Sequence, residues 1–503
     1  MNILTYDAIL IWVIILTTFI LNLFVISIVI WYYSHKKKAE WSTSAIAVLT
    51  TSLSIQALVV LGIDIFATNQ VTSYDQVSAP IFSIIRILYY VFYGSSVTSC
   101  FLVLPFAYFW YEAYNPEESS FQRFMEAFKY TCLFIVCAVV ILIFGLFIRV
   151  SYTGNSVPNS AKDWIREVLN SVSREQSAFI FLLGSMNLIG CLFWITFTAF
   201  GLSELPISLI CDGLYSMRNK EDSESDILLA HQATEPIFVS GYSSRIDEGY
   251  YTWNRYMEKV EKKLTKFFYG MKYCYFSLVL ITGILFTLVS ATLVACILTS
   301  IVYQLIQNYC GPQCQIKLLA NPNLRNLIDR ILGLLQHIHP LDFILLSLIL
   351  AYFYFATISG IRSIQIRCFF VKIFSFGRHR TSPQALIIAS GILIFLAIYL
   401  PTELSLLAPQ YTYWGHKHWL NETDSTHHPC DISHIFSEKL KTNGCKITEM
   451  GQLISKIMGG YTLFSVGIYI ISWLFMLTFI LGIVKSIYSN RRRNISYQLN
   501  VVT

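Results

Sequence analysis

Long apolar stretches that are almost free of charge constrain this chain more than any other feature of its sequence. The first runs from about Ala8 to Tyr33 without a charged side chain and is followed by Lys36–Lys38. A helix needs about 20 consecutive apolar residues to cross the hydrocarbon core of a bilayer. Only 13% of all residues are charged, about half the share found in soluble domains. These features exclude a disordered protein, disfavour a soluble enzyme and predict a polytopic membrane protein.

The predicted fold class is all-α, with about nine transmembrane helices. In the first run the basic residues follow the apolar core, whereas a cleaved signal peptide carries them before it, so we expect the first helix to be retained. Eight further spans are expected at about 44–66, 84–110, 128–148, 178–200, 275–303, 341–360, 384–407 and 461–484.

The distribution of basic residues predicts the orientation. With the N-terminus outside (lumenal) and the C-terminus in the cytosol, the segments on the cytosolic side hold 23 of the 36 lysines and arginines. Basic residues near the ends of spans favour the cytoplasm. Runs such as Arg491–Arg493 are therefore expected to be membrane anchors, and nucleic acid is not expected as a partner.

The predicted organisation has five parts. Residues 1–200 hold five spans with short loops, and residues 201–272 form a cytosolic loop whose second half, Asp247 to Phe268, suggests an amphipathic helix. Residues 273–407 hold spans six to eight with a lumenal loop at about 304–339. Residues 408–456 form a second lumenal loop, and residues 457–503 form the ninth span and a cytosolic tail.

The cytosolic loop contains an acidic residue four positions before a pair of leucines: Glu224, Leu228 and Leu229. This is the pattern that clathrin adaptors read, because the leucines fill an apolar slot while the carboxylate meets a basic patch. We interpret it as an endolysosomal sorting motif. The alternative is the apolar face of a short helix.

The two predicted lumenal loops carry features of an oxidising compartment. Asn421-Glu422-Thr423 is an N-glycosylation acceptor, and only four of the twelve cysteines fall in these loops, namely Cys310, Cys314, Cys430 and Cys445. Disulfides persist on that side of the membrane. Of the three possible connectivities we favour Cys310–Cys314 with Cys430–Cys445. A metal site is not expected, because one cysteine pair lacks further ligands.

Histidines also gather in the last of these loops: His416, His418, His427, His428 and His434. They could act as a pH switch in an acidic lumen or contact a metal-containing ligand. The favoured interpretation is a solvated loop.

Four ionisable residues fall inside predicted spans: Asp64, Arg86, Asp342 and Glu403. Charges at membrane depth are costly and often functional. Each of these lies near a predicted helix end, so a structural role is favoured over a transport pathway. No catalytic signature and no phosphate-binding loop is found, so we expect neither an enzyme nor an ATP site. No tightly bound cofactor is expected.

Several segments, taken in order and spacing, resemble one family of membrane proteins. The most specific region, His339 to Leu420, contains His339-Pro340-Leu341-Asp342-Phe343, Ser359-Gly360-Ile361-Arg362, Arg380-Thr381-Ser382-Pro383-Gln384-Ala385-Leu386 and Leu407-Ala408-Pro409-Gln410-Tyr411. Further pieces are Val60-Leu61-Gly62-Ile63-Asp64-Ile65-Phe66, Pro105-Phe106-Ala107-Tyr108-Phe109 and Thr198-Ala199-Phe200-Gly201-Leu202-Ser203-Glu204-Leu205-Pro206. Nearly the whole chain resembles the limb-region-type membrane proteins, in particular the branch of lysosomal cobalamin transport (escort) proteins.

This resemblance implies a glycosylated, multi-pass lysosomal membrane protein that helps to export cobalamin, its cargo, to the cytosol. It also implies an ABC-type cobalamin exporter as partner. Contacts with cytosolic cobalamin-processing proteins, with a clathrin adaptor, with membrane lipid or with a second copy as a homodimer remain open. The alternatives are a direct cobalamin transporter and an endocytic cell-surface receptor for a soluble carrier such as a lipocalin.

Overall fold

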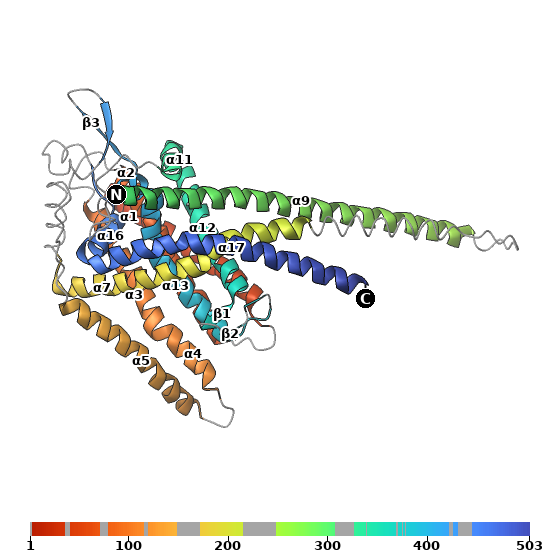
Figure 1. The fold of residues 1–503 in the computed structure, drawn as a ribbon, viewed down its shortest axis with the longest axis horizontal. Helices are drawn as coiled ribbons and strands as arrows, with labels where there is room; N and C mark the ends of the chain where they lie inside the picture. The colour runs from red at the N-terminus through yellow and green to blue at the C-terminus, as the bar shows by residue number, and fades with distance from the viewer. Residues whose placement is uncertain are drawn as a thin grey trace. The chain divides into compact units, whose positions relative to one another are not determined.

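The fold is described from a computed structural model of the whole chain (Figure 1). It describes residues 3–35, 41–70, 79–114, 119–147, 172–214, 248–306, 326–338, 340–368, 371–374, 376–377, 379–421, 426–430 and 445–502. The chain divides into two compact units. The first comprises Met1–Leu202 with Thr292–Phe479, and the second comprises Ser203–Ala291 with Ile480–Thr503.

Helices dominate the described residues, as the sequence predicted. The α-helices are α1 (Ile3–Tyr33), α2 (Trp41–Gln70), α3 (Ala79–Thr98), α4 (Leu104–Glu112), α5 (Ser120–Phe147), α7 (Arg174–Phe193), α9 (Glu248–Ile306), α11 (Leu327–Leu335), α12 (Leu341–Ile364), α13 (Pro383–Leu407), α14 (Pro409–Trp414), α16 (Glu449–Gly460) and α17 (Thr462–Val502). Two single-turn π-helices, η1 (Ser99–Val103) and η2 (Trp194–Thr198), interrupt the third and fifth spans.

Nine helical segments among the described residues are long and apolar enough to cross a membrane, which confirms the expected spans. They are Ile9–Tyr33, Trp41–Gln70, Ile81–Glu112, Ser120–Phe147, Arg174–Leu214, Tyr275–Ile306, Leu341–Ile364, Pro383–Leu407 and Thr462–Ser489. The fifth extends 14 residues past the expected end at residue 200. Helix α9 begins at Glu248 and continues without a break into the sixth span, so the expected amphipathic segment is the start of one long helix. The orientation in the membrane stays a prediction.

Among the described residues, two short antiparallel hairpins add to the helices. Strands β1 (Ile366–Cys368) and β2 (Val371–Phe374) form the first, and β3 (His418–Asn421) and β4 (Thr426–Pro429) form the second. In the second hairpin His418 pairs with Pro429, and Asn421 pairs with Thr426.

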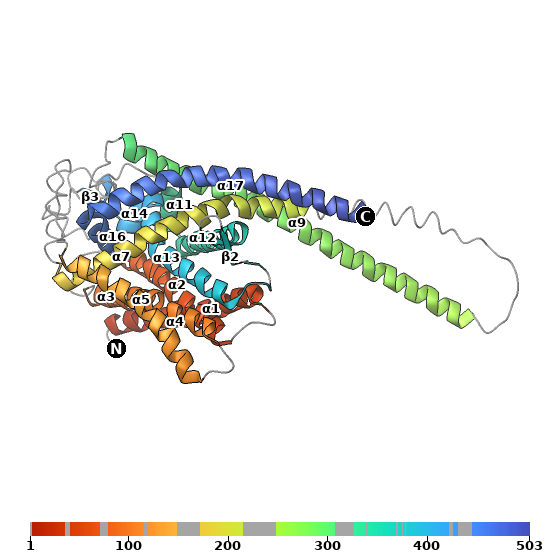
Figure 2. The ribbon, with the colours of Figure 1, turned by 60° about the horizontal axis from the view of Figure 1, so that its bottom comes forward.

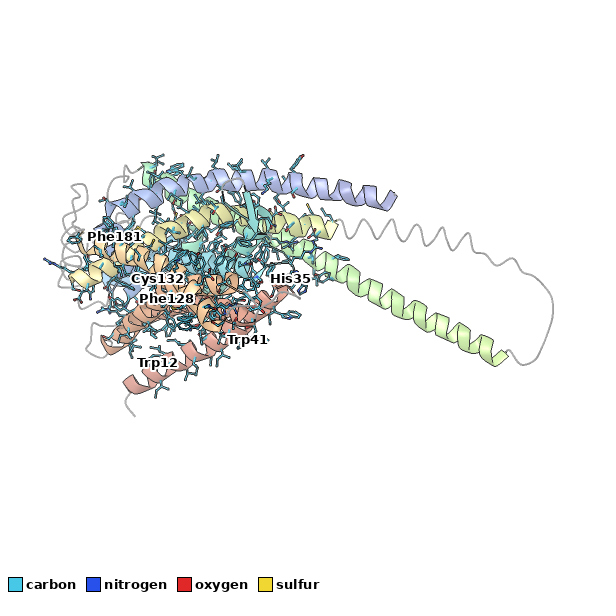
Figure 3. All side chains as sticks on the ribbon, turned by 90° about the horizontal axis from the view of Figure 1, so that it is seen from below. Trp12, His35, Trp41, Phe128, Cys132 and Phe181 are labelled. Carbon is cyan, nitrogen blue, oxygen red and sulfur yellow. A yellow bond between two sulfur atoms is a disulfide. The ribbon has the colours of Figure 1, made fainter. Side chains whose placement is uncertain are left out.

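Helix α13 is the central helix of the first unit. In its most apolar window 83% of the residues are buried, against 6% in the first span and 11% in α5. Helix α13 packs against α2, α7, α4 and α12. It begins sharply because the Ser382 hydroxyl accepts from the amide of Ala385 and Pro383 occupies the first helical position. Helices α1 and α5 present long rows of exposed apolar side chains, and Trp12 on α1 points outward (Figure 3).

Two glycines allow the fifth span to approach α12 closely. A Cβ added at Gly201 would lie 1.7 Å from the carbonyl oxygen of Ala356, and one at Gly360 would lie 1.9 Å from that of Phe197. The hydroxyls of Thr198 and Thr357 are hydrogen-bonded beside this contact, at 2.7 Å. Within the second unit, a Cβ added at Gly283 of α9 would lie 2.8 Å from Cγ1 of Ile210.

Candidate functional site

Asp64 of α2 is fully buried and accepts hydrogen bonds from three donors. Its carboxylate accepts from the amides of Glu449 (3.2 Å) and Met450 (2.9 Å) and from the Tyr89 hydroxyl (3.3 Å). These amides are the first two of α16, where the unpaired N–H groups and the helix dipole favour a negative charge. Asp64 thus joins the second span to the start of a short helix near the end of the chain.

Arg86 of α3 reaches the same place from the next span. Its guanidinium donates to both carboxylate oxygens of Glu449, at 2.9 and 3.1 Å, and the Lys446 ammonium lies 3.7 Å from the same carboxylate. Lys446 also lies over the Phe82 ring. Burial lowers the pKa of Lys446 to about 8, although Glu449 and Asp64 raise it in part. We name this set the α16 network: Asp64, Arg86, Tyr89, Lys446 and Glu449.

Asp342 lies in the first turn of α12, as its position after Pro340 predicted. Its carboxylate accepts from the hydroxyl of Tyr411 at 3.0 Å, and the amide of Tyr411 donates to Asp329 at 3.0 Å. All three side chains are buried. Burial and the neighbouring Asp342 raise the pKa of Tyr411, which keeps its hydroxyl protonated as a donor. This Asp342 cluster joins α11, α12 and α14.

Glu403 lies in the last turns of α13 and is also buried. The Tyr399 hydroxyl, one turn earlier on the same helix, donates to one carboxylate oxygen at 2.7 Å. The other oxygen has no hydrogen-bond partner among the described residues. Nearby, the Asn187 amide of α7 donates to Thr402 at 2.8 Å. This part of the α7–α13 interface therefore contains polar groups in an otherwise apolar core.

The four predicted intramembrane charges lie at one end of the spans. Asp64 lies near the end of α2, Arg86 near the start of α3, Asp342 at the start of α12 and Glu403 near the end of α13. The short elements α11, α14, α16 and the β3–β4 hairpin gather at that end (Figure 2). Three of the four charges, Asp64, Arg86 and Asp342, bind residues of this cap of short elements, and Glu403 lies at the same end of the spans.

A disulfide and main-chain bonds complete this cap. Cys430 and Cys445 are joined, with their Cα atoms 5.9 Å apart, which is one of the two expected pairings. The Cys430 amide donates to the Lys417 carbonyl, and its carbonyl accepts from the Gln410 side chain. The amide of Thr448, the N-cap residue of α16, donates to the Tyr413 carbonyl. The cap thus links both sides of the disulfide to α14.

The other predicted site residues divide into described and undescribed positions. Asn421 ends strand β3, and His427 and His428 lie in β4. The rings of His416 and His418 have centroids 5.3 Å apart. In the described part of the chain no group of three or more His, Cys, Asp or Glu residues is placed to hold a metal ion. Several residues lie outside the described ranges, namely Glu224, Leu228, Leu229, Cys310, Cys314 and His434.

Sequence reasoning missed the partners of these charges. Glu449 and Lys446 belong to a segment that was expected to be loop, although apolar residues recur there at helical spacing, namely Met450, Leu453, Ile454, Ile457 and Met458. Asp329 lies in a segment that was expected to be loop. The spacing of Tyr399 and Glu403 by four residues on one helix was the one signal that could have predicted a pair.

The segments that carry the family resemblance meet one another in space. Tyr411 of Leu407–Tyr411 binds Asp342 of His339–Phe343. The Phe343 ring packs on Phe66 of Val60–Phe66, with ring centroids 5.8 Å apart. The third meeting is the close contact between Gly201 and the carbonyl of Ala356, one turn before Gly360. The resemblance therefore coincides with the helix junctions of the first unit.

Comparisons with known proteins agree with this resemblance. The family model described as LMBR1-like membrane protein matches residues 8–232. A protein of Dictyostelium discoideum named "Probable lysosomal cobalamin transporter" is 29% identical, over 95% of this chain and 94% of its own length. The mouse and human proteins named "Lysosomal cobalamin transport escort protein LMBD1" are each 26% identical, over 91% and 90% of this chain and 90% and 88% of their own lengths. No solved structure matches the chain.

Proposed function

We propose that this protein has a role in cobalamin export. The chain carries an LMBR1-like membrane-protein region and is similar, over more than nine-tenths of its length, to proteins named for lysosomal cobalamin transport. The protein resides in the lysosomal membrane as a multi-pass protein and is required for the release of cobalamin to the cytosol. It acts as an escort that binds an ABC-type cobalamin exporter. The full-length similarity to the relatives carries the proposal.

The arrangement of charges favours an escort over a conduit. Cobalamin is large and rich in amide groups, so a conduit would need a wide polar cavity through the spans. The four intramembrane charges instead lie at one end, and three of them are bound by the cap residues Glu449, Met450 and Tyr411. A cavity of about 370 Å³ between the spans is lined mostly by apolar side chains. That volume is near the lower limit for drug-sized ligands, and cobalamin is larger than these.

Two alternatives remain, each with its own support. A direct cobalamin transporter is favoured by the name of the Dictyostelium relative. An endocytic receptor for a soluble carrier such as a lipocalin would use the same sorting motif from the cell surface. The three functions differ in what the purified protein does alone, so transport in a defined system distinguishes them.

The test is cobalamin efflux from proteoliposomes that contain the purified protein alone, the ABC-type exporter with ATP, or both. The escort function predicts no efflux from the protein alone. It also predicts that the two proteins co-purify and that lysosomes lacking this protein lose the exporter. Efflux from the protein alone would establish a conduit, and no binding to the exporter would contradict the escort function.

Delivery to lysosomes is proposed to depend on Glu224, Leu228 and Leu229, which a clathrin adaptor would bind. Replacing both leucines, Leu228→Ala with Leu229→Ala, should shift the protein from lysosomes to the plasma membrane, as measured by surface biotinylation. The single variant Ser225→Ala changes neither the acidic residue nor the leucines and serves as the control. Unchanged lysosomal residence of the double variant would contradict the motif and leave the transport proposal standing.

A further inference from the structure

A cavity of about 370 Å³ lies between α1, α2, α12 and α13, away from the α16 network. Its inner wall consists of buried side chains of three helices, among them Leu58 of α2, Ile361 of α12 and Ala389 of α13. At the α1 side its wall includes Asn22, whose amide donates to Gln56 of α2. This cavity is at membrane depth, because all four helices are candidate spans.

The cavity opens sideways toward the bilayer. Leu21 and Val25 of α1 line it and are 60% and 43% exposed, and Phe355 of α12 lines it and is 51% exposed. Side chains that are both lining and exposed mark the rim of an opening between α1 and α12. The outer face of α1 is a continuous apolar surface, on which Trp12 projects (Figure 3). A molecule that enters this cavity therefore comes from the lipid phase.

One buried hydroxyl of the cavity lining has no hydrogen-bond partner among the described residues. It belongs to Thr51 of α2, which is 1% exposed. The hydroxyl of Tyr354 of α12 instead pairs with the Ser54 side chain, which itself donates to the Thr51 carbonyl. A buried hydroxyl without a partner costs free energy, so Thr51 indicates a ligand that supplies a polar atom.

The lining also limits which polar group that ligand carries. Among the residues that line this cavity none is charged. A carboxylate or phosphate would be buried there without a counter-charge, which is strongly unfavourable. A single hydroxyl, by contrast, can accept a hydrogen bond from the Thr51 hydroxyl without bringing a charge into the cavity. The remaining lining is aliphatic and aromatic, including Tyr33 and Phe376 at one end.

We propose that this cavity binds a sterol, a compact apolar lipid with one hydroxyl, which enters from the bilayer between α1 and α12. The sterol hydroxyl bonds to Thr51, and its ring system packs on Leu58 and Ala389. The volume is within the range of small-molecule sites. A rigid ring system also loses little conformational freedom when it binds.

The experiment uses the full-length protein in phosphatidylcholine nanodiscs and a photoactivatable cholesterol analogue with a free hydroxyl. Labelling should map to α1, α2 and α12. Unlabelled cholesterol should compete, whereas cholestane, which lacks the hydroxyl, and palmitic acid should compete poorly. Thr51→Val should weaken competition by cholesterol about tenfold, the effect of one lost hydrogen bond.

A second variant and a matched control distinguish binding in this cavity from labelling elsewhere on the protein. Ala351→Phe places a ring at an exposed position of the lining of α12 and should abolish the mapped labelling. Val139→Phe makes a similar change on the exposed face of α5 and should leave it intact. Thermal stability of each variant, measured without sterol, reports folding. Labelling that survives Ala351→Phe in a folded protein, or equal competition by palmitic acid or cholestane, would overturn the proposal.

Discussion

At the scale of single residues, the ion pair between Arg86 and Glu449 joins an exposed side chain to a buried one. The side chain of Glu449 is 5% exposed, whereas that of Arg86 is 56% exposed. Removing the arginine therefore leaves a buried carboxylate with one weaker partner, Lys446. We expect Arg86→Met to lower the free energy of unfolding by about 1–2 kcal/mol, between the values for exposed and buried pairs.

Thermal unfolding of the purified protein in detergent measures this effect. The double variant Arg86→Met with Glu449→Gln should recover part of the loss, because the buried charge is then gone. The exposed lysine Lys129 of α5 provides a control, since Lys129→Met removes a positive charge away from the network. A loss in Arg86→Met no larger than that in Lys129→Met would show that the ion pair contributes nothing.

Lys446 gives the α16 network a pH dependence. Its pKa is lowered from 10.5 to about 8, chiefly by burial. The folded protein thus holds this proton less tightly than the unfolded chain, so the Lys446 contribution to stability improves as pH rises from about 8 to 10.5. Below pH 8, Lys446 is charged and attracted to Glu449.

Amine labelling followed by mass spectrometry measures this pKa directly. Modification of Lys446 should reach half of its maximum near pH 8, because only the neutral amine reacts. A blocked lysine amino acid in the same solution should need a pH near about 10.4. Glu449→Gln removes an attraction for the charged form and should lower the midpoint for Lys446 further. A midpoint equal to that of the free amino acid would refute the burial of this side chain.

At the scale of elements, the close contact between the fifth span and α12 depends on the absence of a side chain at Gly360. A Cβ at this position would lie 1.9 Å from the Phe197 carbonyl oxygen, so Gly360→Ala should separate the helices. We expect a loss of about 1–3 kcal/mol in stability, typical of overpacking. In α3, a Cβ at Gly94 would meet nothing within 4 Å.

Gly94→Ala should therefore stabilise the protein slightly, by about 0.5–1 kcal/mol, because alanine is the better helix former. We therefore predict that, in the same thermal assay, Gly360→Ala lowers the stability of the protein and Gly94→Ala raises it. A neutral Gly360→Ala would show that these two helices do not approach closely in the membrane.

The elements also show what sequence reasoning could and could not reach. The nine spans follow from local composition and were therefore predictable. Their ends were less accurate: the fifth helix continues to Leu214, beyond its apolar part, because a helix can extend into more polar sequence. The partner of Asp64 was not predictable, because it is the start of a helix 385 residues away. Asp342 was placed correctly in a first helical turn from Pro340 alone, but its bond to Tyr411 depends on the tertiary fold.

For the whole molecule, the cap explains why charges near several span ends need not form a path. Short elements after the eighth span fold back onto the ends of α2, α3 and α12 and bind their polar groups. Partners of the spans then meet mainly apolar surfaces, such as the exposed face of α5. This arrangement suits binding to another membrane protein or to lipid better than passage of a polar solute.

The side of the membrane on which the cap lies fixes the orientation of the whole chain. Glycosylation of Asn421, at the end of β3, tests which side this is. If the cap is lumenal, Asn421-Glu422-Thr423 carries a glycan, so Asn421→Gln should remove one glycan and increase electrophoretic mobility. Treatment with a glycosidase should make the wild type migrate like the variant. Asn494-Ile495-Ser496 follows the ninth span, on the predicted cytosolic side, so Asn494→Gln should change nothing. A glycan lost from Asn494→Gln and not from Asn421→Gln would invert the topology, expose Leu228 and Leu229 to the lumen, and so remove the basis for adaptor binding.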